Sequence, residues 1–269
     1  MSSRAEPSTA SPAERPDDAG SAVRPSEGWG VVHLMLRARR GEGGGGEILR
    51  AVSDLTREEP QQAIAFSLLG ARADFGLMAL SPDLDALDRF TKRVLSGPVD
   101  PVASFVSLTE QSEYASTEDD ERARLAEAGE ADVEAALATW RERIAAYRDA
   151  KVHPRLPRRR VIAFYPMSKR RDPGANWYEL DFEERKRLML GHGRVGRGYA
   201  GRVLQLITGA TGLDDWEWGV TLLADDPLAI KEIVYEMRFD PVSARYAEFG
   251  PFWTGLVVEP GEALARAGL

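Results

Sequence analysis

The chain has no cysteine and only three histidines among its 269 residues. Without cysteine it cannot form disulfides, zinc ribbons, iron–sulfur clusters or thiol nucleophiles. With only His33, His153 and His192, a cage of several histidines around one metal ion is nearly excluded.

Long apolar runs and an excess of positive charge are also absent. No run approaches the roughly 18 apolar residues of a membrane-spanning helix, and the N-terminus lacks the apolar core of a signal peptide, so we expect a cytoplasmic location. The formal net charge of −8 disfavours nucleic acid, whose phosphates require an excess of Lys and Arg. Basic residues nevertheless gather at 155–160 and 169–171, which suits a small anionic ligand.

The sequence divides into four stretches of different composition. Residues 1–27 are rich in Ser, Pro, Ala and Glu and are predicted to be a disordered tail, because they cannot bury enough apolar surface. Residues 28–116 show strand and helix patterns in the order β-α-β-β-α-β, and residues 160–269 repeat that order. The charged stretch 117–159 predicts an amphipathic helix that lies on the core and connects the two.

The repeated order predicts the fold class. We expect an α+β protein made of two ferredoxin-like halves whose antiparallel sheets face each other, as in dimeric α+β barrels. The expected strands are 30–37, 62–69, 73–80, 102–109, 160–167, 202–208, 216–223 and 251–258. The expected helices are 47–57, one after Pro82, 181–198 and 226–237.

A histidine lies on the apolar face of the helix expected at 181–198. His192 shares this face with Leu188, and such a histidine is usually a hydrogen-bonded core residue, an interpretation that stays open here. Gly191 and Gly193 flank it and leave room for a flat ligand to approach. One imidazole is what a porphyrin iron commonly takes from a protein, since the macrocycle supplies its equatorial ligands.

The stretch FYPMSKRR (164–171) places three polar or adaptable side chains on one face of a strand. Alternation puts Tyr165, Met167 and Lys169 on the same side, with Tyr165 and Lys169 about 13 Å apart. A strand that runs into a solvated basic turn explains this pattern. A pocket wall with a phenol and an ammonium group, the latter meeting a carboxylate, explains it too.

Polar residues of two further elements are candidates. Gln205 lies among apolar residues of a strand, where leaving its amide unpaired would cost about 1–3 kcal/mol. It therefore faces either a wet cavity or a structural hydrogen-bond partner. Arg238 ends a helix and is followed by Ser243. Arginine binds carboxylates bidentately, although at a helix end it often only complements the helix dipole.

Taken together, four stretches resemble the coproheme decarboxylases, members of the wider chlorite dismutase-like superfamily. They are FYPMSKRR (164–171), NWYELDFEERKRLMLGHGRVGRGYAG (176–201), QLITGATGLDDWEWGVTL (205–222) and YEMRFDPVSARYAEFGPF (235–252). The resemblance covers about 160–255, and the tail and the charged helix fall outside it.

The resemblance implies roles at the matching positions. His192 would be the proximal ligand of the iron, and Gln205 would lie on the distal side. Tyr165 would be the redox-active tyrosine that abstracts hydrogen from a propionate, and Lys169 would anchor and help protonate a reacting propionate. The other expected porphyrin contacts are Arg238, Ser243, Met167, Tyr114 and Lys151, the last where the family commonly has an arginine.

The implied reaction is the hydrogen peroxide-dependent oxidative decarboxylation of coproheme (iron-coproporphyrin III) to haem b through a three-propionate intermediate. This is the last step of coproporphyrin-dependent haem biosynthesis. The resemblance also implies a homo-oligomer, a pentamer in the family, and transient contact with the ferrochelatase that supplies coproheme.

Two alternatives stay open. The first is a chlorite dismutase or peroxidase-like enzyme, but true chlorite dismutases have an arginine where Gln205 stands. The second is a haem carrier or sensor, which would need His192 and Arg238 but would have no use for Tyr165.

Overall fold

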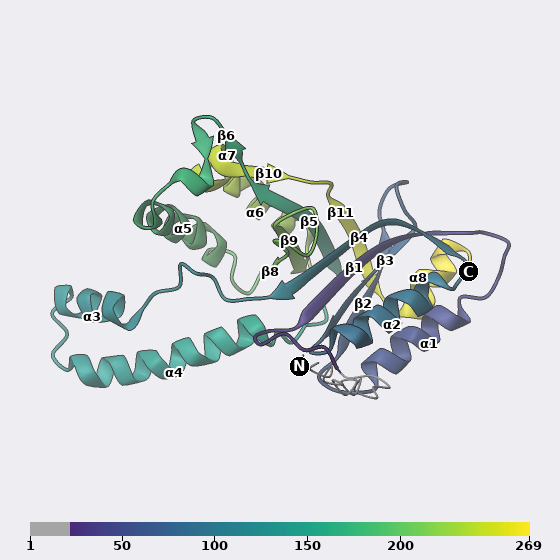
Figure 1. The fold of residues 1–269 in the computed structure, drawn as a ribbon, viewed down its shortest axis with the longest axis horizontal. Coiled ribbons are helices and arrows are strands. Elements are labelled where there is room, and N and C mark those ends of the chain that lie inside the picture. Colours follow the sequence, from purple (N-terminus) through teal and green to yellow (C-terminus); the bar gives the residue numbers. More distant parts are fainter. Residues whose placement is uncertain (1–21) are drawn as a thin grey trace, which may run out of the picture.

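The computed structural model describes residues 22–269 (Figure 1). Of the predicted disordered tail, residues 1–27, residues 1–21 lie outside the described residues. In the described remainder, the Val23 backbone N–H donates to Asp83 at 3.0 Å, and the Val23 carbonyl oxygen accepts from the Leu84 N–H at 2.9 Å.

The first half of the chain forms a four-stranded antiparallel sheet with helices on one face. Its elements, in chain order, are β1 (Gly30–Ala38), α1 (Gly46–Thr56), β2 (Gln62–Leu68), β3 (Phe75–Ser81), α2 (Leu84–Leu95) and β4 (Val99–Thr109). Strand β1 pairs with β3 and β4, and β2 pairs with β3. Helices α1 and α2, together with the C-terminal α8 (Pro260–Ala267), cover the outer face of this sheet (Figure 1).

The second half repeats this order with small insertions. The repeated elements are β5 (Val161–Lys169), α5 (Phe182–Arg197), β8 (Val203–Gly209), β9 (Trp218–Ala224), α6 (Pro227–Met237) and β11 (Trp253–Val258). The inserted elements are β6 (Arg171–Asp172), β7 (Ala175–Asn176), the short 3-10 helix η1 (Trp177–Glu179), α7 (Pro241–Tyr246) and β10 (Ala247–Phe249). The predicted α+β class and the twofold β-α-β-β-α-β order are confirmed.

The two predicted sheets also join at their edges. Strand β2 pairs with β11, and β4 pairs with β8 over Leu108–Thr109. With β5 paired to β9 and β11 inside the second sheet, the strands close into one antiparallel barrel. Sequence alternation predicts which side chains share a face, but it does not show which strand edges meet.

Strand alternation divides the apolar residues between the inside and the outside of the barrel. Phe164 of β5 belongs to the interior cluster, together with Phe66 and Phe105. The next residue, Tyr165, belongs to the outer cluster, which packs beneath α6 around Ile230. Strand β5 therefore presents Tyr165 to the space between the barrel wall and the helices of the second half.

The charged connection forms two helices instead of one. Helix α3 (Glu118–Glu127) and helix α4 (Val133–Val152) flank Gly129, whose φ of +70° breaks the helical path. They form a helical arm, residues 118–152, that projects from the barrel (Figure 1). The expectation of one helix lying on the core is therefore wrong. In residues 22–269 neither α4 nor any other helix has the length and apolarity to cross a membrane.

Candidate functional site

His192 is held by a buried carboxylate. Helix α5 begins where Asp181 accepts a hydrogen bond from the Glu184 backbone N–H at 2.8 Å, and His192 follows three turns later. Its Nδ1 lies 2.7 Å from Oδ2 of Asp240, whose side chain is only 4% exposed. Since a carboxylate can only accept, the hydrogen lies on Nδ1, and Nε2 is left as the nitrogen that can bind a metal.

This arrangement fits a porphyrin iron. No group of three or more His, Asp or Glu side chains within residues 22–269 is placed to hold a metal ion, and the Asp240 carboxylate beside His192 is occupied by Nδ1. A Cβ added at Gly191 would meet nothing within 4 Å, which leaves open space beside the imidazole. At Gly193 a Cβ would lie 3.1 Å from the Arg197 side chain, so the space predicted on that side is narrower. A single oriented imidazole is the donor that an iron porphyrin requires.

Tyr165 lies in an aromatic pocket on the outer face of β5. Its side chain is 7% exposed and stacks on Phe252, with ring centroids 4.2 Å apart, while Phe249 meets it edge-on at 5.8 Å. Burial raises the pKa of the phenol to about 12, and the nearby Arg238 guanidinium opposes that shift. The phenol is therefore neutral near pH 7.

Arg238 shares the aromatic neighbours of Tyr165. It is the C-cap residue of α6, and its guanidinium lies 4.2 Å from the centroid of the Phe249 ring and 5.9 Å from that of Phe252. Stacking on a ring leaves the N–H groups in the guanidinium plane available to a carboxylate. The structure thus brings Tyr165 and Arg238 together.

Lys169 ends β5 and lies close to the His192 partner. Its side chain is buried, and Nζ lies 4.3 Å from the centroid of the Trp177 ring. Burial lowers the pKa of Lys169 to about 8, while the negative charges of Asp240 and Glu217 oppose that shift. Asp240 therefore acts on both His192 and Lys169.

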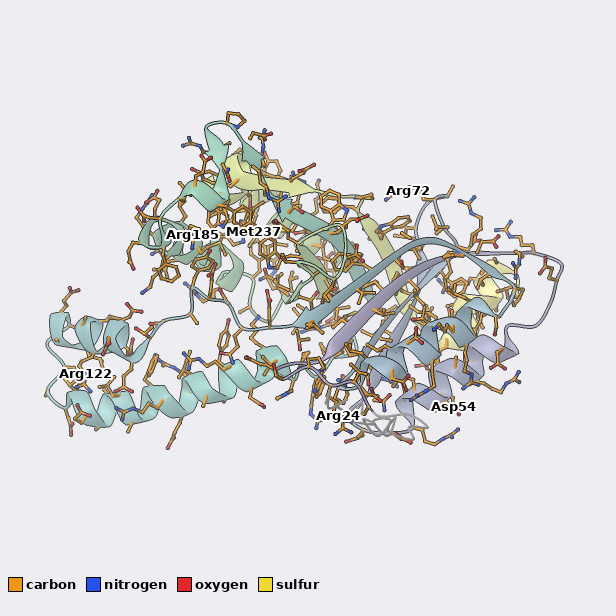
Figure 2. All side chains as sticks on the ribbon, in the orientation of Figure 1. Arg24, Asp54, Arg72, Arg122, Arg185 and Met237 are labelled. Carbon is orange, nitrogen blue, oxygen red and sulfur yellow. The ribbon has the colours of Figure 1, made fainter. Side chains whose placement is uncertain are left out.

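Gln205 faces α5 from strand β8. Its Nε2 donates to the Gly196 carbonyl oxygen at 3.0 Å, and Gly196 lies one turn beyond His192, on the same helix face. Met237 of α6 also approaches Gly196, and Figure 2 labels it where α6 ends beside α5. The partner that the sequence required is thus a backbone carbonyl. To face a bound porphyrin, Gln205 would have to give up this bond.

Lys151 lies near Gln205. It is in the last turn of α4, its Nζ is 3.5 Å from the Gln205 carbonyl oxygen, and burial lowers its pKa. The helical arm therefore returns to the barrel next to the candidate distal residue.

The remaining candidates lie in two places. Met167 packs against the same outer cluster as Tyr165. Ser243 is buried, and its backbone N–H donates to Asp240 at 3.1 Å. Tyr114 meets Trp177 edge-on, with ring centroids 6.3 Å apart, and its hydroxyl accepts from Nε of Arg185, which Figure 2 shows on α5. Tyr114 is thus grouped with Lys169 through Trp177 and lies apart from the Tyr165 pocket.

Sequence reasoning missed several residues that shape this site. Asp240 is 48 positions from His192 and, with Pro241 after it, has the pattern of an ordinary helix N-cap. Trp177 and Glu217 lie within the stretches that carry the resemblance, but no spacing rule links either of them to Lys169. Only the folded structure brings these pairs into contact.

Comparisons with known proteins agree with this architecture. A profile of the family described as chlorite dismutase matches residues 46–258. Proteins of Natronomonas pharaonis and Haloarcula marismortui, provisionally named heme-binding proteins, are 45% and 42% identical to the chain and cover 81% and 76% of it. The chain spans 35% and 29% of the length of these two relatives.

Solved structures show the same likeness. One, described as a novel heme-binding protein from Thermus thermophilus, is 34% identical with a TM-score of 0.72, and the match covers 90% of this chain and 96% of that one. A variant of chlorite dismutase from Candidatus Nitrospira defluvii is 15% identical with a TM-score of 0.64, covers 91% and 97% of the two chains, and shows likeness of fold alone.

The fold and the site define an antiparallel α+β barrel with ferredoxin-like halves and a carboxylate-held histidine against its wall. Since the family profile matches most of the sequence, the chain belongs to the chlorite dismutase family.

Proposed function

We propose that the protein is a coproheme decarboxylase that binds iron-coproporphyrin III through His192 and uses hydrogen peroxide to convert it to haem b. The observation that carries the proposal is the outer face of β5, where a neutral buried phenol and a buried ammonium group accompany the carboxylate-held His192. The relatives named for heme binding support the porphyrin ligand.

The chemistry balances with one peroxide for each propionate. The propionate loses two electrons and one proton and releases its carboxylate as CO2, which leaves a vinyl group. Hydrogen peroxide accepts the two electrons, and with the released proton and one further proton it becomes two waters. The iron porphyrin, when bound, passes the oxidising equivalents of peroxide to the protein and substrate. Two such turnovers produce haem b through the three-propionate porphyrin.

Tyr165 suits hydrogen abstraction. Because burial holds its pKa near 12, the phenol keeps its proton until it loses an electron, and proton and electron then leave together. The resulting tyrosyl radical can take hydrogen from a propionate methylene group. Phe249 and Phe252 exclude water from the ring and so limit competing reactions of the radical.

The cations around the site suit propionates. With a pKa of about 8, Lys169 is mainly an ammonium group near neutral pH, so it can pair with a carboxylate and also supply the proton that the balance requires. Arg238 can hold a second carboxylate with its free N–H groups. Met167, Ser243, Tyr114 and Lys151 complete the proposed porphyrin contacts, with Gln205 on the distal side.

Assembly belongs to the same proposal. We infer a homo-oligomer, a pentamer by family resemblance, that works in the cytoplasm and receives coproheme through transient contact with a ferrochelatase.

Loading with coproheme tests the function directly. The purified protein is loaded with iron-coproporphyrin III, hydrogen peroxide is added stepwise, and porphyrin masses are followed. We expect successive loss of two carboxyl groups with the three-propionate species between them. Tight binding without mass loss would contradict the proposal and favour the carrier or sensor. Release of oxygen from added chlorite, without decarboxylation, would favour chlorite dismutase chemistry.

A further inference from the structure

A buried carboxylate outside the predicted site connects the elements that surround Lys169. Glu217 ends the connection between β8 and β9 and is only 5% exposed. Its Oε2 accepts the Lys169 backbone N–H at 2.7 Å, and its Oε1 pairs with the Arg171 guanidinium. Burying a carboxylate is costly unless charges or hydrogen bonds satisfy both oxygens, and here both are satisfied.

The two oxygens of Glu217 bind on either side of the cation–π contact between Lys169 and Trp177. One oxygen fixes the backbone of Lys169 itself. The other holds Arg171 in β6, which pairs with Asn176 of β7, and the next residue is Trp177. Trp177 is the ring over which the Lys169 ammonium lies, at 4.3 Å. The Glu217 backbone N–H also donates to the Met167 carbonyl oxygen at 3.1 Å, so the connection is tied to β5 at two points.

We propose that Glu217 is the positioning residue of Lys169: through the Lys169 backbone and Arg171 it holds the ammonium group against Trp177, where it meets a substrate carboxylate. This rests on the proposed function only in taking iron-coproporphyrin III as the ligand. Glu217 does not touch the substrate, and its effect passes through Lys169.

A double-mutant cycle tests this. Glu217→Gln, Lys169→Met and the double variant are compared with wild type by absorbance titration with iron-coproporphyrin III. Loss of a charge-assisted contact predicts a dissociation constant about tenfold higher for Lys169→Met, and we expect a smaller rise, about fivefold, for Glu217→Gln. If Glu217 acts through Lys169, the double variant binds no more weakly than Lys169→Met alone.

A matched control comes from the helical arm. Glu121 is also a buried glutamate paired with an arginine, Arg124, at 2.7 Å. Glu121→Gln should leave the dissociation constant unchanged. The Arg171 side chain is 64% exposed, so Arg171→Gln is expected to fold. If Glu217→Gln fails to fold, Arg171→Gln replaces it in the double-mutant cycle.

Three results would overturn the positioning role. The first is an unchanged affinity for iron-coproporphyrin III in Glu217→Gln. The second is that Glu217→Gln lowers the affinity equally in wild type and in Lys169→Met. The third is wild-type affinity in Lys169→Met, since Lys169 would then make no contact that needs positioning. The cycle measures binding, so it is read independently of turnover. If the wild type binds but never decarboxylates while the cycle is non-additive, the proposed function fails and the role of Glu217 stands.

Discussion

Asp240 accepts hydrogen bonds from two directions. One comes from Nδ1 of His192 and the other from the backbone N–H of Ser243, where Asp240 caps α7. The first orients the imidazole and makes it a more basic ligand, and the second fixes the carboxylate. The position of His192, the proposed proximal ligand, therefore depends on the position of α7.

Asp240→Asn should weaken the contact with His192 while keeping the cap of α7. Asparagine still caps a helix, so we expect the fold to be kept. The amide is a weaker acceptor for His192, and partners of this kind typically contribute on the order of tenfold to metal affinity. Titration with iron-coproporphyrin III should show that loss, and resonance Raman spectroscopy should show a weaker iron–histidine bond. Unchanged affinity and spectrum would refute the orienting role.

Tyr165→Phe tests the phenol alone. Phenylalanine fills the same pocket between Phe249 and Phe252, so iron-coproporphyrin III should bind within about threefold of wild type. Without a phenolic hydrogen, decarboxylation should fall by at least about a hundredfold. Mass analysis after peroxide addition provides the measurement, and a variant that turns over normally would rule out the radical role.

The pH dependence should reflect Lys169. Its ammonium form, which pairs with a carboxylate, predominates below the pKa of about 8 and is lost above it. Both affinity for iron-coproporphyrin III and decarboxylation should therefore decline as the pH rises through about 8. In Lys169→Met this decline should disappear. A wild-type profile that is flat through this range would contradict the assignment.

At the scale of elements, α5 depends on its N-cap. Asp181→Ala removes the hydrogen bond to Glu184, and such caps contribute about 1 kcal/mol to the free energy of unfolding. We expect lower stability together with weaker porphyrin binding, because α5 carries His192. Thermal unfolding and absorbance titration measure the two effects.

Asp83→Ala is the matched control, since Asp83 caps α2 in the other half. It should lower stability similarly and leave porphyrin affinity unchanged. Equal losses of affinity in both variants would mean that general stability, and not the α5 cap, controls binding.

The helices and strands of this protein can be predicted from the sequence where a local pattern, such as an N-cap or apolar alternation, specifies them. Asp181 and the apolar spacing predict α5, and alternation correctly places Tyr165 and Met167 in one cluster on the outer face of β5. The sequence does not predict the helical arm, because the apolar stripe of α4 is equally compatible with packing on the barrel and with packing against α3. The break at Gly129 was the available sign.

At the scale of the whole molecule, the contacts that complete the site are long-range. Glu217 reaches Lys169 across 48 positions, and His192 reaches Asp240 across the same separation. The antiparallel pairing of β5 with β9 inside the second-half sheet brings the first pair together. Such contacts depend on which strand edges meet, and a single sequence carries no local signal for that.

Strand β5 and helix α5 differ in how firmly they are held. Strand β5 is hydrogen-bonded to β9, β10 and β11, whereas α5 includes Gly191, Gly193 and Gly196, which each weaken a helix by about 1 kcal/mol relative to alanine. Local opening should therefore be cheap for the helix and rare for the strand.

Porphyrin entry would then proceed by displacement of α5 from a fixed wall. In hydrogen–deuterium exchange, α5 amides should exchange quickly without ligand and become protected on addition of iron-coproporphyrin III, while β5 amides stay slow in both states. Comparable protection of both elements on binding would show that the wall also rearranges. Transient opening of α5 would thus admit the porphyrin, while Tyr165 and Lys169 on β5 would already be in position.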